Sequence, residues 1–293
     1  MIRKRLIGVW LVAGFLIFAA GVFWLWRSDV NSSLVSYQSD KLNPSIFSVT
    51  DFFTEYENPS VDICSHDMLG GITTHHQQAS PLIGQFFKCL AVSTYPKTVV
   101  LIGPNHYHRG SRGVVLASQA WDTPFGILEP DIEAITQLAE SDLVEINDNA
   151  VSQDHAVGLL IPYLSYYFPE AKVVPMLINY SVNEAQTEKF QQFINRVLDE
   201  HTIVVGSIDF SHYLTSAESN VMDGETNEIV RNYKLDEIYK NGDEHYDSAP
   251  GLYIILSLMK QKNARTETIA HSDTSEFNGV SSYVTSYFNW VFL

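Results

Sequence analysis

Histidines stand at the ends of three β-branched segments of this chain. The segment 98–103 runs into GPNHYH, which carries His106, while GGITTH ends at His75 and TIVVGSI is soon followed by His212. Imidazole nitrogens bind zinc, iron and copper, and two of them with one anionic ligand leave coordination positions open for a substrate. This spacing favours a divalent-metal site over the plainer interpretation of three solvated loop histidines.

Alternating strand-like and helix-like segments indicate how these histidines meet. The expected strands cover 70–75, 98–103, 113–118, 172–178 and 202–208, with two closing strands in TETIAH and SYVTSYFNWVF. The expected helices begin near 80 and 131, and cover about 154–168, 183–200, 216–240 and 249–262. This order is typical of an α/β domain with a central mixed, largely parallel sheet flanked by helices.

In such a sheet the binding crevice lies beyond the carboxyl ends of the strands, where the three histidines should converge. We assign His75 and His106 as metal ligands and His212 as an acid or base, because the imidazole pKa lies near neutrality. Asp209 either orients groups in the site or caps the following helix. His155, at the start of the expected helix 154–168, points into the same crevice or faces solvent.

The first 27 residues are predicted to form a membrane anchor. Three basic residues precede an uncharged run of 21 residues, Leu6–Trp26, which is long enough to cross a bilayer. The basic flank predicts a cytoplasmic N-terminus with the rest of the chain outside the cytoplasm. Cleavage after Ala20 or Gly21 stays open as the alternative. Residues 28–60 are predicted to be a linker with one short helix around 48–56, and residues 61–293 the α/β domain.

Charge excludes one class of partner. Four of the 18 basic residues and none of the 34 acidic residues lie in 1–27, so the remainder carries a formal charge of −20. Such a surface repels phosphate backbones, and no nucleic-acid partner is expected. The two cysteines, Cys64 and Cys89, form a disulfide in an oxidising compartment or stay as buried thiols, and their spacing fits no zinc finger.

An ordered set of motifs resembles the Memo family, known in prokaryotes as AmmeMemoRadiSam system protein B. The motifs are HH after GGITT, GPNH, W-x-TPFG, the DH of QDHAVGLLIPYL, DFSHY, and SAPG. The resemblance implies a fold similar to class III extradiol dioxygenases, with His75 and His106 at the metal. It places His155 and His212 at positions similar to further histidines beside the metal of those dioxygenases.

Two departures from the family pattern bear on the chemistry. The family's third ligand is a cysteine before a glycine, and the matching residue here is Pro250, which has no side-chain donor. Only two protein ligands then remain unless Asp247, Asp209, Asp273 or a water completes the site. The acidic residue that the family carries after the helix histidine is also changed, at or near Gly158.

Three functions therefore stay open. In the first, this is a membrane-anchored extracytoplasmic Memo-like protein with a His-lined crevice, a degraded metal site that holds iron, copper or zinc weakly or not at all, and non-catalytic binding of a small molecule or peptide. In the second, it is a metal-dependent enzyme related to class III extradiol dioxygenases. A purely structural ectodomain is the third.

Overall fold

The computed structural model describes residues 41–54 and 63–293. The predicted membrane anchor, 1–27, lies outside the described residues, as does part of the predicted linker. Within the described part of the chain, no helix is both long and apolar enough to cross a bilayer.

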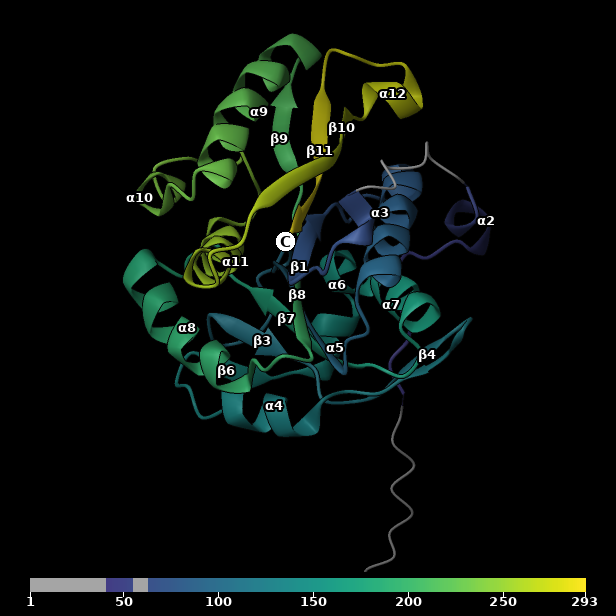
Figure 1. Cartoon of the computed structure of the whole chain (residues 1–293), viewed down its shortest axis with the longest axis vertical. Helices are drawn as coiled ribbons and strands as arrows, with labels where there is room; N and C mark the ends of the chain where they lie inside the picture. Colours follow the sequence, from purple (N-terminus) through teal and green to yellow (C-terminus); the bar gives the residue numbers. More distant parts are fainter. Residues whose placement is uncertain (1–40, 55–62) are drawn as a thin grey trace, which may run out of the picture. The chain divides into compact units, whose positions relative to one another are not determined.

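A nine-stranded mixed sheet forms the centre of the described domain (Figure 1). Its strand order is β10-β11-β1-β8-β2-β7-β3-β6, with β9 also pairing to β11. The central strands β1, β8, β2 and β7 run parallel, whereas β11 and β3 are antiparallel to their central neighbours. The strands are β1 (Gly70–Thr73), β2 (Thr98–Pro104), β3 (Val114–Leu116), β6 (Val144–Ile146), β7 (Lys172–Ile178), β8 (Thr202–Ser207), β9 (Phe210–Leu214), β10 (Thr266–Asp273) and β11 (Val284–Phe292). The expectation of an α/β domain with a largely parallel central sheet is thus confirmed.

Helices cover both faces of this sheet, and a separate hydrophobic core lies on each. One core is covered by α4 (Ile132–Leu138), α8 (Glu184–Val197), α9 (Ser216–Arg231), α10 (Leu235–Ile238) and α11 (Ala249–Gln261). The other is covered by α2 (Val49–Phe52), α3 (Ser80–Ser93), α5 (Asp148–Ser152), α6 (His155–Gly158) and α7 (Ile161–Tyr167). All seven residues of β2 are buried, as expected for a parallel strand with helices on both faces.

Several elements are divided, or are additional, relative to those expected from the sequence. The helix expected over 154–168 is two helices, α6 and α7, because Pro162 occupies the first turn of the second and cannot continue the first. The helix expected over 216–240 ends at Arg231 and resumes as α10. DFSHY supplies strand β9, and TPFG turns a short hairpin of β4 (Trp121–Thr123) and β5 (Gly126–Leu128).

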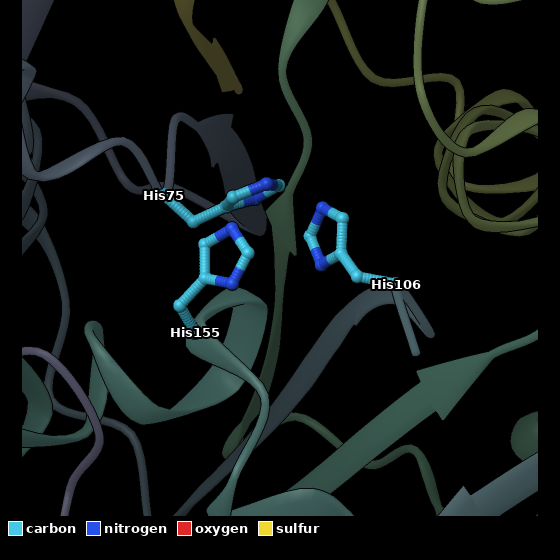
Figure 2. A group of neighbouring side chains, drawn as sticks. All are labelled: His75, His106 and His155. Carbon is cyan, nitrogen blue, oxygen red and sulfur yellow. The ribbon is translucent and has the colours of Figure 1, made fainter. Parts of the chain in front are cut away.

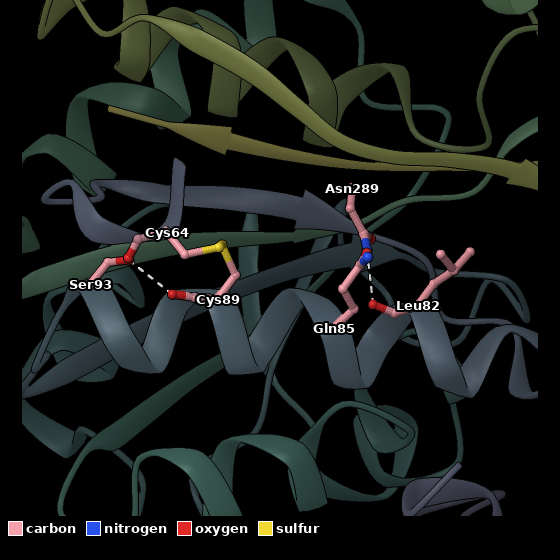
Figure 3. The surroundings of a disulfide bond; sticks show 6 residues. All are labelled: Cys64, Leu82, Gln85, Cys89, Ser93 and Asn289. Atoms are coloured by element: carbon pink, nitrogen blue, oxygen red, sulfur yellow. Dashed lines mark hydrogen bonds between the residues drawn. A yellow bond between two sulfur atoms is a disulfide. The ribbon is translucent and has the colours of Figure 1, made fainter. Parts of the chain in front are cut away.

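Cys64 and Cys89 form a disulfide between the 3-10 turn Ile63–Ser65 and α3, which resolves the two alternatives left by the sequence (Figure 3). On the same helix, the carbonyl of Leu82 accepts a hydrogen bond from the Asn289 amide of β11 at 2.8 Å. The side-chain oxygen of Asn289 in turn accepts a hydrogen bond from the Thr73 hydroxyl at 2.7 Å. These contacts fix the end of β1, the strand that leads to His75.

Candidate metal centre

Three histidines from distant parts of the sequence meet at the carboxyl ends of the central strands (Figure 2). His75 follows β1, His106 follows β2, and His155 is the first residue of α6. Each offers a ring nitrogen, and these three nitrogens lie within 4.8 Å of one another. The rings of His106 and His155 stack with their centroids 4.2 Å apart, and the ring of His75 lies edge-on to both. The cluster is compact enough for one ion after small side-chain adjustments.

The strand order explains why His75 and His106 converge. Strands β1 and β2 lie on either side of β8 and run parallel to it, so their carboxyl ends reach the same edge of the sheet. His155 arrives there because Asp154, the N-cap of α6, accepts the backbone N–H of Ala156 at 3.0 Å and starts the helix at this edge.

Both strand-end histidines are held through their Nδ1 atoms. In His106, Nδ1 lies 2.9 Å from the buried Asp154 carboxylate. In His75, Nδ1 lies 3.1 Å from the hydroxyl of Ser207, whose own proton is donated to the carbonyl of Ala156. With a proton on each Nδ1, the Nε2 atoms carry the free lone pairs. This arrangement presets the tautomer that a metal ligand needs.

Two aspartates bring negative charge to His75. The Nε2 atom of His75 lies 3.2 Å from Oδ2 of Asp247 and 3.8 Å from Oδ2 of Asp209. Oδ1 of Asp209 also accepts hydrogen bonds from the His75 backbone N–H, at 3.1 Å, and from the Thr74 hydroxyl. His75, Asp209 and Asp247 form a second group of donor atoms within 4.8 Å. Asp209 therefore lies beside His75, and the helix that follows it, α9, is capped by Thr215 instead.

Asp247 differs from Asp209 in that its carboxylate has no hydrogen-bonding environment of its own. Both oxygens are buried and accept no hydrogen bond from the described residues. Oδ2 also lies 3.9 Å from Nε2 of His106, so it faces both strand-end histidines. A buried carboxylate without donors is costly unless a cation neutralises it.

Burial and charge set opposite protonation states for two of the histidines. Burial lowers the pKa of His75, but the carboxylates of Asp209 and Asp247 outweigh that effect and raise the pKa to about 9. Burial, followed by the charges of His75 and His106, lowers the pKa of His155 to about 4. At neutral pH the metal-free site thus holds a protonated His75 next to a neutral His155.

A pocket of about 330 Å³ opens beside His106. It is lined by Pro104, Asn105, His106, His108, Tyr180, His212, Tyr213, Asp243 and Asp247. His212 sits in β9 at this pocket, with Nδ1 3.2 Å from the carbonyl oxygen of Asp243, and it belongs to neither donor group. The structure thus brings His75, His106, His155 and Asp209 together and places His212 on the pocket wall.

Sequence reasoning missed two residues that orient the histidines. Asp154 directly precedes the helix that starts at His155, so its position as an N-cap was a usable signal. Ser207 lies inside the apolar run of β8, and nothing in the sequence marks it as a partner of His75.

The fold and the site define an α/β protein with a histidine- and aspartate-lined crevice at the strand ends. The family model described as Memo-like protein matches residues 55–291, and the chain belongs to this family, as the motifs predicted. It is 30% identical to a MEMO1 family protein of Pyrobaculum aerophilum over 154 residues, half of this chain and 54% of that protein. A MEMO1 family protein of Nitrosopumilus maritimus is 24% identical over 78% of this chain and 86% of its own length.

One solved structure supports the fold. The crystal structure of an uncharacterized Escherichia coli K12 protein superposes with a TM-score of 0.52 and 14% identity, covering 75% of this chain and 99% of the other. At that identity the likeness concerns the fold alone.

Proposed function

We propose that this Memo family protein is a metal-dependent enzyme whose centre uses Asp247 where the family uses a cysteine. His75 and His106 are the imidazole ligands, and Asp247 supplies the negative charge that Pro250 cannot. The observation that carries this proposal is the buried Asp247 carboxylate, which faces Nε2 of both histidines. Among the described residues its negative charge is met by the His75 imidazolium at 3.2 Å, and no hydrogen bond to either oxygen is formed. Two histidines and one carboxylate are a ligand set typical of open iron(II) sites, and zinc and copper accept the same donors.

The donor chemistry of the site fits a divalent ion. Three aspartates, Asp154, Asp209 and Asp247, lie next to the histidine cluster, and a dication would offset their charge. The protonated His75 partly plays that role in the metal-free protein, and its proton must leave when a metal binds. A bound ion would polarise a substrate oxygen and lower the pKa of a coordinated water.

The remaining residues have roles that follow from their positions. His155 is neutral near pH 7 because its pKa lies near 4, so it can accept a proton from a group in the cluster. Asp209 fixes the backbone of His75 and adds negative charge. His212, on the wall of the pocket, is placed to contact a substrate.

A second candidate function is the non-catalytic binding of a small molecule or peptide. The observation in its favour is the rim of the pocket, where Tyr180 and Tyr213 expose 70% and 61% of their surface. Exposed aromatic side chains around a pocket favour contact with a flat or apolar ligand. This function needs no metal, so metal binding discriminates between the two.

We also propose that the domain lies outside the cytoplasm, anchored by the apolar segment Leu6–Trp26. The length of that run and its basic flank support the anchor. The Cys64–Cys89 disulfide supports an oxidising compartment. External protease treatment of intact cells should cleave a membrane-bound protein. A domain that is protected until the cells are lysed would contradict this placement.

The decisive experiment is metal titration of the full chain in detergent. Iron, copper and zinc are added separately under reducing conditions mild enough to keep the disulfide, and bound metal is counted. We expect one ion per chain, lost in His106→Ala and retained in His201→Ala, whose imidazole is 43% exposed and forms an ion pair with the neighbouring Glu200. If the unmodified protein binds none of the three, the enzyme proposal fails and the second candidate replaces it.

A further inference from the structure

Residues 41–54, assigned to the linker by sequence, pack against the domain, and we call them the strap. The strap precedes the stretch that the family model matches, which begins at residue 55. It is therefore an addition to the part of the chain that resembles the family.

Two contacts fasten the strap to the domain. The N–H of Leu42 donates to the carbonyl of Ala120 at 2.8 Å, and the Leu42 carbonyl accepts from Asp122 at 2.8 Å, a short parallel pairing beside β4. Phe52 of α2 is 6% exposed and packs among aromatic rings of the domain. Those within 5 Å of it include Phe125 and Tyr163. A segment held at both ends in this way is part of the fold.

Between these contacts the strap crosses α6, the helix that carries His155. A β-carbon added to Gly158 would lie 2.8 Å from the backbone nitrogen of Ser45 and would overlap the Ser45 hydroxyl. Only glycine leaves room for the strap at this point.

The strap also contacts the segment that follows His75. Oδ2 of Asp51 accepts a hydrogen bond from the Gln77 amide at 3.0 Å, two residues beyond His75. The strap thus touches the elements that carry two of the three clustered histidines.

We propose that the strap is a positioning element of the crevice, which holds α6 through the Ser45–Gly158 contact and thereby fixes His155 and its N-cap, Asp154. Since Asp154 binds His106, displacement of α6 would disturb that ligand as well. The effect on metal binding rests on the proposed function, whereas the effect on α6 does not.

The test is Gly158→Ala in the full chain, with Gly224→Ala as the matched control. Gly158 has no positive φ, and an alanine in an unobstructed helix is favoured over glycine. In α9, a β-carbon on Gly224 would meet no atom within 4 Å, so Gly224→Ala should leave the protein as stable or more stable. Gly158→Ala should instead displace the strap. Phe52→Ala releases the strap without altering α6 and should act in the same direction.

Hydrogen exchange of the backbone amides is measured first. We expect loss of protection over 41–54 and over α6 in Gly158→Ala and Phe52→Ala, and no loss in Gly224→Ala. Metal affinity is measured second, and it should fall by about tenfold or more in the two strap variants, as for other residues that orient metal ligands. Ser45→Gly combined with Gly158→Ala should recover part of the protection.

Each outcome has one meaning. Unchanged exchange in Gly158→Ala would overturn the strap contact itself. Loss of protection in the strap alone, with α6 and metal affinity unchanged, would overturn its positioning role. If the unmodified protein binds no metal, the proposed function fails, while exchange in α6 still decides this inference.

Discussion

Asp154 holds His106 through both of its carboxylate oxygens. Oδ1 lies 2.9 Å from Nδ1 of the imidazole, and Oδ2 accepts the backbone N–H of the same residue at 2.9 Å. Because Asp154 also caps α6, one fully buried carboxylate orients a proposed ligand and starts the helix that carries His155. Burial raises the pKa of Asp154, but the hydrogen bond and charge of His106, together with the Ala156 N–H and the charge of His155, outweigh burial and lower the pKa.

Asp154→Asn should weaken metal binding by about 10- to 100-fold. An amide has only one acceptor oxygen, so it cannot accept from both Nδ1 and the backbone N–H of His106, and it lacks the negative charge that raises the basicity of the imidazole. The measurement is a zinc or iron titration of the full chain. The matched control is Asp131→Asn, which alters a helix N-cap remote from the histidine cluster. Equal losses of affinity in both variants would mean that the effect comes from general destabilisation.

Asp247→Asn should abolish stoichiometric metal binding, because it removes the charge proposed to replace the family's thiolate. Asp243 lines the same pocket but forms no ion pair with His75 or His106. Asp243→Asn should therefore still bind metal. His155→Gln should weaken binding less than Asp247→Asn. The reverse order would make the three-histidine group the ligand set.

Parallel strands made part of this site predictable. His75 and His106 could be expected together because both follow β-branched strands, and strand ends of a parallel sheet share an edge. His155 was recognisable as the start of a helix, but the sequence did not show whether its side chain points into the crevice or faces solvent. The central strands and most helices were found for the same reason, since buried parallel strands are continuous apolar runs.

The sequence offered Asp247 as one of several candidates for the third ligand but could not single it out. Asp247 reaches the histidines because its backbone N–H donates to the carbonyl of Asp209 at 3.1 Å, next to a bridge between Phe210 and Tyr246. That pairing depends on β9, which lies outside the strands expected from the sequence. Long-range pairing of short segments leaves no local pattern in the sequence. The same holds for the strap, because its packing against the domain depends on Gly158, more than 110 residues from Ser45.

Removing the disulfide should destabilise the protein without removing the site. The bridge spans a sequence separation of 25 residues, for which the loss of chain entropy predicts about 3–4 kcal/mol. The variant Cys64→Ala/Cys89→Ala should lose that amount of unfolding free energy in urea and keep its metal stoichiometry. Loss of metal binding in a still folded variant would show that the bridge is needed to hold β1 and His75 in place.

The stability of the metal-free protein should peak near pH 6.5 because His75 and His155 are shifted in opposite directions. The folded pKa of His75 is raised to about 9, so its contribution is complete below 6.5 and is lost as the pH rises through 9. The folded pKa of His155 is lowered to about 4, so its contribution is complete above 6.5 and is lost as the pH falls toward 4. Each contribution is at most roughly 3 kcal/mol.

Urea unfolding of the metal-free full chain between pH 4 and 9.5, with the disulfide intact, measures both sides of this curve. His155→Gln should reduce the loss of stability on the acid side and leave the alkaline side unchanged. The remaining acid loss comes from His76, Asp154 and Asp209, whose pKa values are also lowered. Saturating zinc should remove the loss of stability above pH 6.5, because the metal replaces the proton on His75. A free energy of unfolding that stays constant from pH 6.5 to 9 in the metal-free protein would mean that His75 is neutral there, and that Asp247 is neutralised by some other cation.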